Sequence, residues 1–214
     1  MASTFPGSID SFSNPATNSP LTSPSHAGQH QDLNDAVNKI ETYMGLVKVI
    51  PTAATNGTIG ATGAVTVGNA VASVSVTCFT SVYDNYRIIY TGGVGSVGTQ
   101  IRLAFNGITT GYYGGYFSTN YSSGAFVGGG DNNTAQFNNA GWASTSNIYF
   151  NVDVTNPFTT GARKNISAYG GFNSNGYGMY HGECTGTASA TGFTISPASG
   201  TLTGGTIRVY GYRN

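Results

Sequence analysis

The sequence predicts a mainly β protein, an antiparallel jelly-roll-like β-sandwich that follows an extended N-terminal arm and one short coiled-coil-like helix. Only 7% of the 214 residues are charged and 32 are glycine, a composition that suits a turn-rich β protein better than long exposed helices. From Leu46 onward, strand-like alternation recurs about every ten residues with turn signals between the strands. We therefore divide the chain into an arm (1–30), a helix (31–45) and a sandwich (46–214).

The segment 1–30 is expected to be an extended arm that anchors the protein to a larger particle. Most of the 7 prolines lie within its first 25 residues, and a proline-rich composition favours extended backbone. Its scattered apolar side chains could lie in grooves of a partner. These side chains are Phe5, Ile9, Phe12 and Leu21. A disordered tail would explain the same composition equally well.

Residues 31–45 carry the only helical pattern that we find in the sequence. Asp32 can cap its start, and Gly45 follows its end, where a left-handed residue is common. The apolar residues, spaced by 4, 3 and 4, are Leu33, Val37, Ile40 and Met44. This spacing is typical of a coiled-coil seam, and a helix this short needs partners to be stable in water. We expect a parallel bundle between subunits; the alternative is one amphipathic helix packed on its own sheet.

Two histidines continue this seam towards the arm. His30 falls at an a position and His26 at a d position of the same heptad. If both line a bundle, their protonation below a pKa of about 6.5 would bring like charges together and weaken assembly. Histidines of a solvated loop are the alternative. We include both in the expected oligomerisation site.

The strands of the sandwich are predicted from strict alternation of apolar and polar residues. The clearest cases are 101–105, 148–154 and 207–210. Asn106-Gly107 predicts a hairpin turn. Residues 122–147 are rich in glycine, asparagine and serine, and we expect a long surface excursion that carries Trp142.

Two cysteines are present, at positions 78 and 184. Cys78 continues the alternation of Val74 and Val76, which predicts a buried thiol. A disulfide to Cys184 requires the two strands to be neighbours, and synthesis in a reducing cytoplasm argues against it. Whether the two cysteines pair is left open.

Residue types that carry chemistry are sparse in this sequence. His181 and Glu183 share one face of a strand, but zinc needs further ligands. The glycine-rich runs lack the lysine and the following helix of a phosphate-binding loop. We therefore expect no enzymatic activity, no metal and no cofactor. Lysine and arginine are too few for nucleic-acid binding, and no apolar run is long enough to insert into a membrane.

A cluster of aromatic residues is the candidate ligand site. Flat rings flanked by asparagine and glycine suit sugars, which stack their apolar faces and hydrogen-bond at their edges. The candidate glycan contacts are Tyr112, Tyr113, Tyr116, Tyr121 and Trp142. The alternative is that these residues belong to the core or to a subunit interface.

Several segments together resemble structural proteins of tailed bacteriophages. The run 25–45 resembles an N-terminal helix found in many of them, and the remainder resembles the β-sandwich of fibre, tail and capsid-decorating proteins. The matching segments are Ser25–Gly45, Phe79–Val82, Tyr86–Ile89, Ile101–Gly107 with Tyr112, Gly192–Pro197, Ser199–Thr201 and Gly205–Tyr212.

The resemblance implies a structural protein on the exterior of the virion, assembled in the host cytoplasm. It implies a homotrimer with its arm bound to capsid or tail proteins, as in a head fibre or capsid decoration protein. The alternative is a tail fibre that recognises host-surface glycans through its sandwich, or a lectin-like adhesive domain unrelated to phages.

Overall fold

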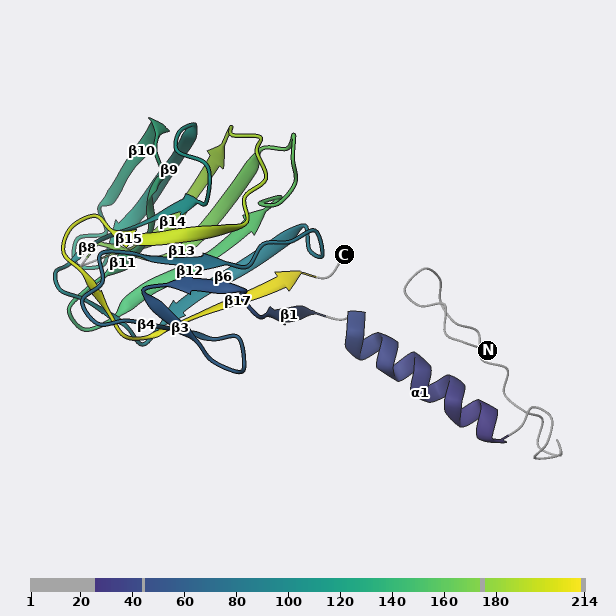
Figure 1. Ribbon diagram of the computed structural model, residues 1–214. Coiled ribbons are helices and arrows are strands. Elements are labelled where there is room, and N and C mark those ends of the chain that lie inside the picture. Colours follow the sequence, from purple (N-terminus) through teal and green to yellow (C-terminus); the bar gives the residue numbers. More distant parts are fainter. Residues whose placement is uncertain (1–25, 44, 174–175, 213–214) are drawn as a thin grey trace. The chain divides into compact units, whose positions relative to one another are not determined.

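The computed structural model of the chain describes residues 26–43, 45–173 and 176–212, without the side chains of residues 26, 27, 41–43, 172 and 173. It divides into two compact units. One extends to Leu46, and the other is Val47–Tyr212. The boundary lies one residue from the one that the sequence predicts. Figure 1 shows the elements of both units.

The first unit contains the helix α1, His26–Tyr43. It begins five residues before the predicted start at residue 31. Asp32 therefore lies inside the helix, and the expectation that it caps the helix is wrong. Gly45 has a φ of +81°, which confirms the expected left-handed residue after the helix.

The second unit is an antiparallel β-sandwich of two sheets joined through β12. The larger sheet has the order β10-β9-β14-β13-β12-β6-β17, and β1, β4 and β3 continue it beyond β17. Its strands are β1 Leu46–Val49, β3 Gly57–Ile59, β4 Val65–Val67, β6 Asn85–Thr91, β9 Tyr112–Asn120, β10 Phe126–Thr134, β12 Ile148–Thr155, β13 Lys164–Asn173, β14 Gly176–Cys184 and β17 Thr206–Tyr212.

The smaller sheet has the order β11-β8-β15-β5-β2. Its strands are β2 Ala53–Thr55, β5 Val74–Thr77, β8 Thr99–Phe105, β11 Phe137–Ala143 and β15 Gly192–Pro197. Two short strands, β7 Val94–Gly95 and β16 Leu202–Thr203, pair separately. The first residues of β12 pair with β11 and its later residues pair with β6 and β13, so the chain passes from one sheet to the other within β12.

The strand order is interleaved, as in a jelly roll. The chain runs from β4 in the larger sheet to β5 in the smaller one, then returns to β6 and crosses again to β8. Strands β15 and β17 complete the two sheets beside β5 and β6. The fold is therefore mainly β, and it agrees with the predicted antiparallel sandwich.

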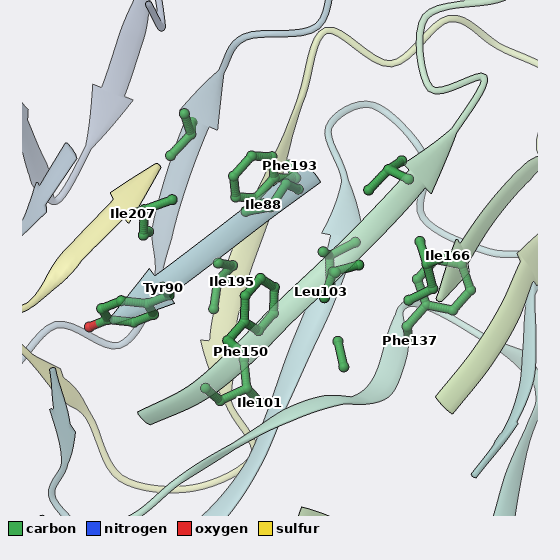
Figure 2. Packing of buried hydrophobic residues seen from close by; sticks show 14 of the residues in the cluster. Ile88, Tyr90, Ile101, Leu103, Phe137, Phe150, Ile166, Phe193, Ile195 and Ile207 are labelled. Atoms are coloured by element: carbon green, nitrogen blue, oxygen red, sulfur yellow. The ribbon is translucent and has the colours of Figure 1, made fainter. Parts of the chain in front are cut away.

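The core lies between the two sheets (Figure 2). Strand β8 buries every second residue, as its alternation predicts, and β12 and β17 do the same. The larger sheet contributes Ile88, Tyr90, Phe150, Ile166 and Ile207 to this layer, and the smaller sheet contributes Ile101, Leu103, Phe137, Phe193 and Ile195. Burial of these side chains from two sheets is the main source of stability.

Two expectations about loops are wrong. Asn106-Gly107 forms a turn, with Ile108 N–H donating to the Phe105 carbonyl, but the flanking strands β8 and β9 do not pair with each other. The turn instead carries the chain between sheets. Residues 122–147 are not a loop either, because they contain β10 and β11, and β11 buries Phe137.

The two cysteines, Cys78 and Cys184, are both buried free thiols. The predicted burial of Cys78 is confirmed, and burial raises the pKa of its thiol. A thiol held in its protonated form is a poor nucleophile, so we assign no chemistry to it.

A polar network on the outer face of the larger sheet joins β6, β12 and β17. Arg87 donates from Nε and Nη2 to the Asp153 carboxylate at 2.8 and 2.7 Å, and the Tyr212 hydroxyl donates to Asp153 Oδ1 at 2.5 Å. Partial burial opposes ionisation of Asp153, but the hydrogen bonds from Arg87 and Tyr212 outweigh it and hold the pKa of this carboxyl below its ordinary value of 3.8. Burial and the bond to Asp153 raise the pKa of Tyr212 to about 12.

This network predicts acid-sensitive stability. Because the pKa of Asp153 is lowered by folding, its contribution is complete above the ordinary value of 3.8 and is lost as the pH falls through the folded value. We expect Asp153→Asn to lower the free energy of unfolding by about 1–2 kcal/mol at pH 7. The difference from the wild type should shrink as the pH falls below 3.8, as measured by urea unfolding at each pH. Glu183→Gln is the control, because its ion pair with Arg163 is more exposed; an equal effect of both variants would contradict the prediction.

Candidate functional site

The candidate site lies on an extension of the larger sheet that is built from two separate segments of the chain. Strands β9 and β10 lie between β8 and β11 in the sequence, and β13 and β14 lie between β12 and β15. The two hairpins join where β9 pairs with β14. We call strands β10, β9, β14 and β13 the extension; they lie together at one side of the sandwich in Figure 1.

The register of these strands brings polar and aromatic side chains to one face of the extension. Tyr113 of β9 pairs with Glu183 of β14, and Glu183 pairs with Asn165 of β13. One step along, Gly115 pairs with His181, and His181 pairs with Ser167. Cross-strand partners point to the same side of a sheet, so these residues share the outer face while their neighbours in sequence face the core.

A shallow pocket of about 430 Å³ opens on this face. Its lining consists of Tyr113, Gly114, Asn165, Ile166, Ser167, His181, Gly182 and Glu183. The side chains that can interact with a ligand are one phenol, one amide, one hydroxyl, one imidazole and one carboxylate. Gly115, the partner of His181 on β9, has no side chain, so β9 leaves the imidazole uncovered. The space at this glycine is open, because a Cβ on Gly115 would have no atom closer than 3.7 Å.

Hydrogen bonds fix the polar groups of the pocket. Ser167 Oγ and His181 Nδ1 lie 3.0 Å apart and share one hydrogen bond. The ring of Tyr169 meets the imidazole edge-to-face, with centroids 6.2 Å apart. At the other end, Arg163 Nη1 donates to Glu183 Oε1 at 2.7 Å. This pair compensates the charge of Glu183, so no single sign of charge dominates the pocket.

The floor of the pocket is attached rigidly to the core. A Cβ on Gly182 would lie 2.6 Å from the Phe137 ring, so glycine allows Phe137 to pack directly against β14. The neighbouring Tyr180 is fully buried and its hydroxyl donates to Asp131 Oδ2 at 2.6 Å. Asp131 also accepts from the backbone and side chain of Asn138. These contacts hold β10, β14 and β11 together beneath the site.

Exposed aromatic rings lie beside the pocket on the extension. Phe117, Tyr169 and Tyr177 are each about half exposed and occupy the same face by register. Farther along the strands, the Tyr177 ring lies 5.8 Å from that of Tyr121 and 5.6 Å from that of Tyr149. The surface on this side of the pocket is therefore aromatic, whereas Asp153 of β12, the cross-strand partner of Ser167, brings its ion pair with Arg87 to the other side.

Two of the predicted glycan contacts do not reach this surface. Tyr112 is fully buried; its hydroxyl donates to the Ile108 carbonyl at 3.0 Å and accepts from Phe105 N–H at 2.8 Å. That part of the prediction is wrong, and the alternative of a core tyrosine is correct for Tyr112. Tyr116 lies on the opposite face of β9, where its ring lies across Gly129.

The other three predicted contacts are separated. Tyr113 lines the pocket and is 37% exposed, and Tyr121 packs beside Tyr177 on the same extension. Trp142 lies on β11, where it pairs with Gln100 of β8 and with Tyr149 of β12, and it does not line the pocket. The five residues therefore do not form one site.

Two residues of β13 that no sequence motif marks, Asn165 and Ser167, complete the pocket. Asn165 and Ser167 alternate with the buried Ile166 and Ala168, so their outward orientation could have been predicted from the sequence. Their position beside His181 could not, because the pairing of β13 with β14 has no local sequence signal.

The predicted seam on α1 is exposed within the single chain. Leu33, Val37 and Ile40 are 54%, 44% and 42% exposed. His30 is also exposed, and it lies one turn before Leu33 on the helix. Met44 and the side chain of His26 lie outside the described residues, as do the proposed anchoring side chains Phe5, Ile9, Phe12 and Leu21.

Comparison with known proteins identifies no relative: no protein-family model, curated protein or solved structure matches this chain. Among the residues that the structure describes, no group of three or more His, Cys, Asp or Glu side chains could bind a metal ion. No helix within the described ranges is long and apolar enough to span a bilayer.

Proposed function

We propose that this chain is a self-assembling structural protein of a bacteriophage particle, a homotrimeric head fibre or capsid decoration protein. The observation that carries the proposal is the apolar stripe of α1, whose residues Leu33, Val37 and Ile40 have coiled-coil spacing and are exposed in the single chain. Burial of such a stripe between identical helices removes apolar surface from water.

The remaining parts of the chain fit this role. The sandwich is a rigid unit with a continuous buried core, and its low charge suits a durable exterior module. In the proposal, the arm binds along the particle surface, the helices set the register of the subunits, and the sandwiches face outward. The order of the segments and the resemblance to phage structural proteins support this arrangement.

The test separates assembly from attachment. Particles made without this chain are mixed with the full chain or with a variant that lacks residues 1–25, and binding is measured by co-sedimentation. We expect both proteins to have the same oligomeric mass and only the full chain to bind particles. Equal binding of both proteins would contradict the role of the arm, and absence of binding by the full chain would overturn the proposal.

A second candidate function is recognition of host-surface glycans, as in a tail fibre. The observation that favours it is the exposed aromatic face of the extension, which includes Tyr113 and Tyr121 of the predicted set. Rings of this kind can stack against the apolar faces of sugars. The two functions are compatible, because they use different parts of the chain.

A further inference from the structure

The pocket on the extension has the chemical composition of a site for a neutral sugar. Tyr113 provides an exposed ring at one wall. Hydroxyl-bearing ligands need donors and acceptors at several points, and the pocket offers both types through Asn165, Ser167, His181 and Glu183. Small-molecule sites combine apolar surface with a few fixed polar groups in this way.

The polar groups keep unused hydrogen-bonding capacity. Ser167 and His181 share one hydrogen bond, which leaves further hydrogen-bonding capacity on the hydroxyl and on the Nε2 atom of the imidazole. Arg163 contacts Oε1 of Glu183, and a carboxylate has more acceptor positions than this one bond occupies. These groups can therefore bind ligand hydroxyls without breaking the bonds that orient them.

The charge of the pocket favours no strongly ionic ligand. Glu183 and Arg163 compensate each other, so the pair offers no unpaired opposite charge to an acidic sugar, a phosphate or a cation. The shallow shape also fits one or two exposed rings rather than an enclosed cofactor. A pyranose has an apolar face for Tyr113 and equatorial hydroxyls for the polar wall.

We propose that Tyr113, Asn165, Ser167, His181 and Glu183 bind a neutral hexopyranose, with its ring stacked on Tyr113 and its hydroxyls bonded to the side chains of β13 and β14. This inference rests on the second candidate function and assigns it to a specific site. The site excludes Tyr112, Tyr116 and Trp142, and it lies wholly within one chain.

The experiment uses the full chain labelled with ¹⁵N, four neutral ligands, which are the methyl glycosides of glucose, galactose, mannose and N-acetylglucosamine, and sialic acid as an acidic ligand. Amide chemical shifts are followed by NMR up to about 20 mM glycoside, which is sufficient for a millimolar dissociation constant. We expect at least one glycoside to shift the amides of 113–115, 165–167 and 181–183. Tyr113→Ala should weaken binding about tenfold, and Ser167→Ala should weaken it severalfold.

Matched variants make the result specific to the pocket. Tyr113→Phe keeps the stacking ring and should retain most of the affinity. Phe117→Ala removes an exposed ring from the same strand and face, outside the pocket, and should change the dissociation constant less than twofold. Far-UV circular dichroism and thermal unfolding establish that each variant is folded.

The outcomes distinguish the site from the broader function. Glycoside binding that is unchanged by both Tyr113→Ala and Ser167→Ala overturns the assigned site and leaves glycan recognition intact. No shift with any glycoside overturns both the site and the glycan function. Binding of sialic acid in preference to all four neutral glycosides overturns the inference that the ligand is neutral.

Discussion

Replacement of Val37 by aspartate is expected to convert the assembled protein into monomers. In the proposed bundle, Val37 lies between Leu33 and Ile40 in the seam, so a charge there would be buried among apolar side chains of neighbouring helices. Burial of an unpaired carboxylate is far more costly than the association of so short a helix can offset. Light scattering coupled to size exclusion should give three chains of 22.0 kDa each for the wild type and one for Val37→Asp.

The control for this variant is Asn38→Asp. Asn38 is exposed and adjacent in sequence, but its heptad position faces away from the seam. The same negative charge at this position should leave the mass unchanged. A wild-type chain that is monomeric at micromolar concentration, or a Val37→Asp variant that keeps its oligomeric mass, would contradict the proposed bundle.

The largest loss of stability is expected for Phe137→Ala. Phe137 is fully buried, and its ring lies 4.8 Å from that of Tyr112, 5.8 Å from that of Phe105 and 6.0 Å from that of Tyr180. It therefore connects the core of the sandwich with the extension. Removal of such a ring leaves a cavity and should lower the free energy of unfolding by about 3–5 kcal/mol, as measured by urea denaturation.

Phe117→Ala is the matched control for this loss. The same side chain is removed, but Phe117 is half exposed on the outer face of β9, so the change should be below about 1 kcal/mol. If Phe137→Ala costs no more than Phe117→Ala, the packing between sandwich and extension contributes little. Hydrogen exchange should also accelerate most in β9 and β14, which contact the ring through Tyr112 and Tyr180.

The sequence predicts which residues of a strand are buried much better than which strands pair. In β8, β12 and β17 the alternation of apolar and polar residues is local, and it identifies the buried set correctly. The turn at Asn106-Gly107 is also local, yet the next strand joins the other sheet. Turn chemistry fixes the direction of the backbone over a few residues, whereas the partner of β9 is decided by distant contacts.

The candidate site illustrates the same limit at the level of side chains. Tyr112 and Tyr113 are neighbours of the same type, and only the register of β9 assigns one to the core and the other to the pocket. Ser167 and His181 are separated in the sequence, and the β13–β14 hairpin places them side by side. A cluster of aromatic residues in the sequence therefore locates the region but not the members of the site.

The construction of the extension from two hairpins couples occupancy of its pocket to unfolding. Tyr113 belongs to one hairpin, and Ser167 and His181 belong to the other. A ligand that contacts all three side chains would therefore link β9 to β14 without a covalent bond. Such a molecule binds only the folded form and raises the melting temperature in proportion to the logarithm of its concentration.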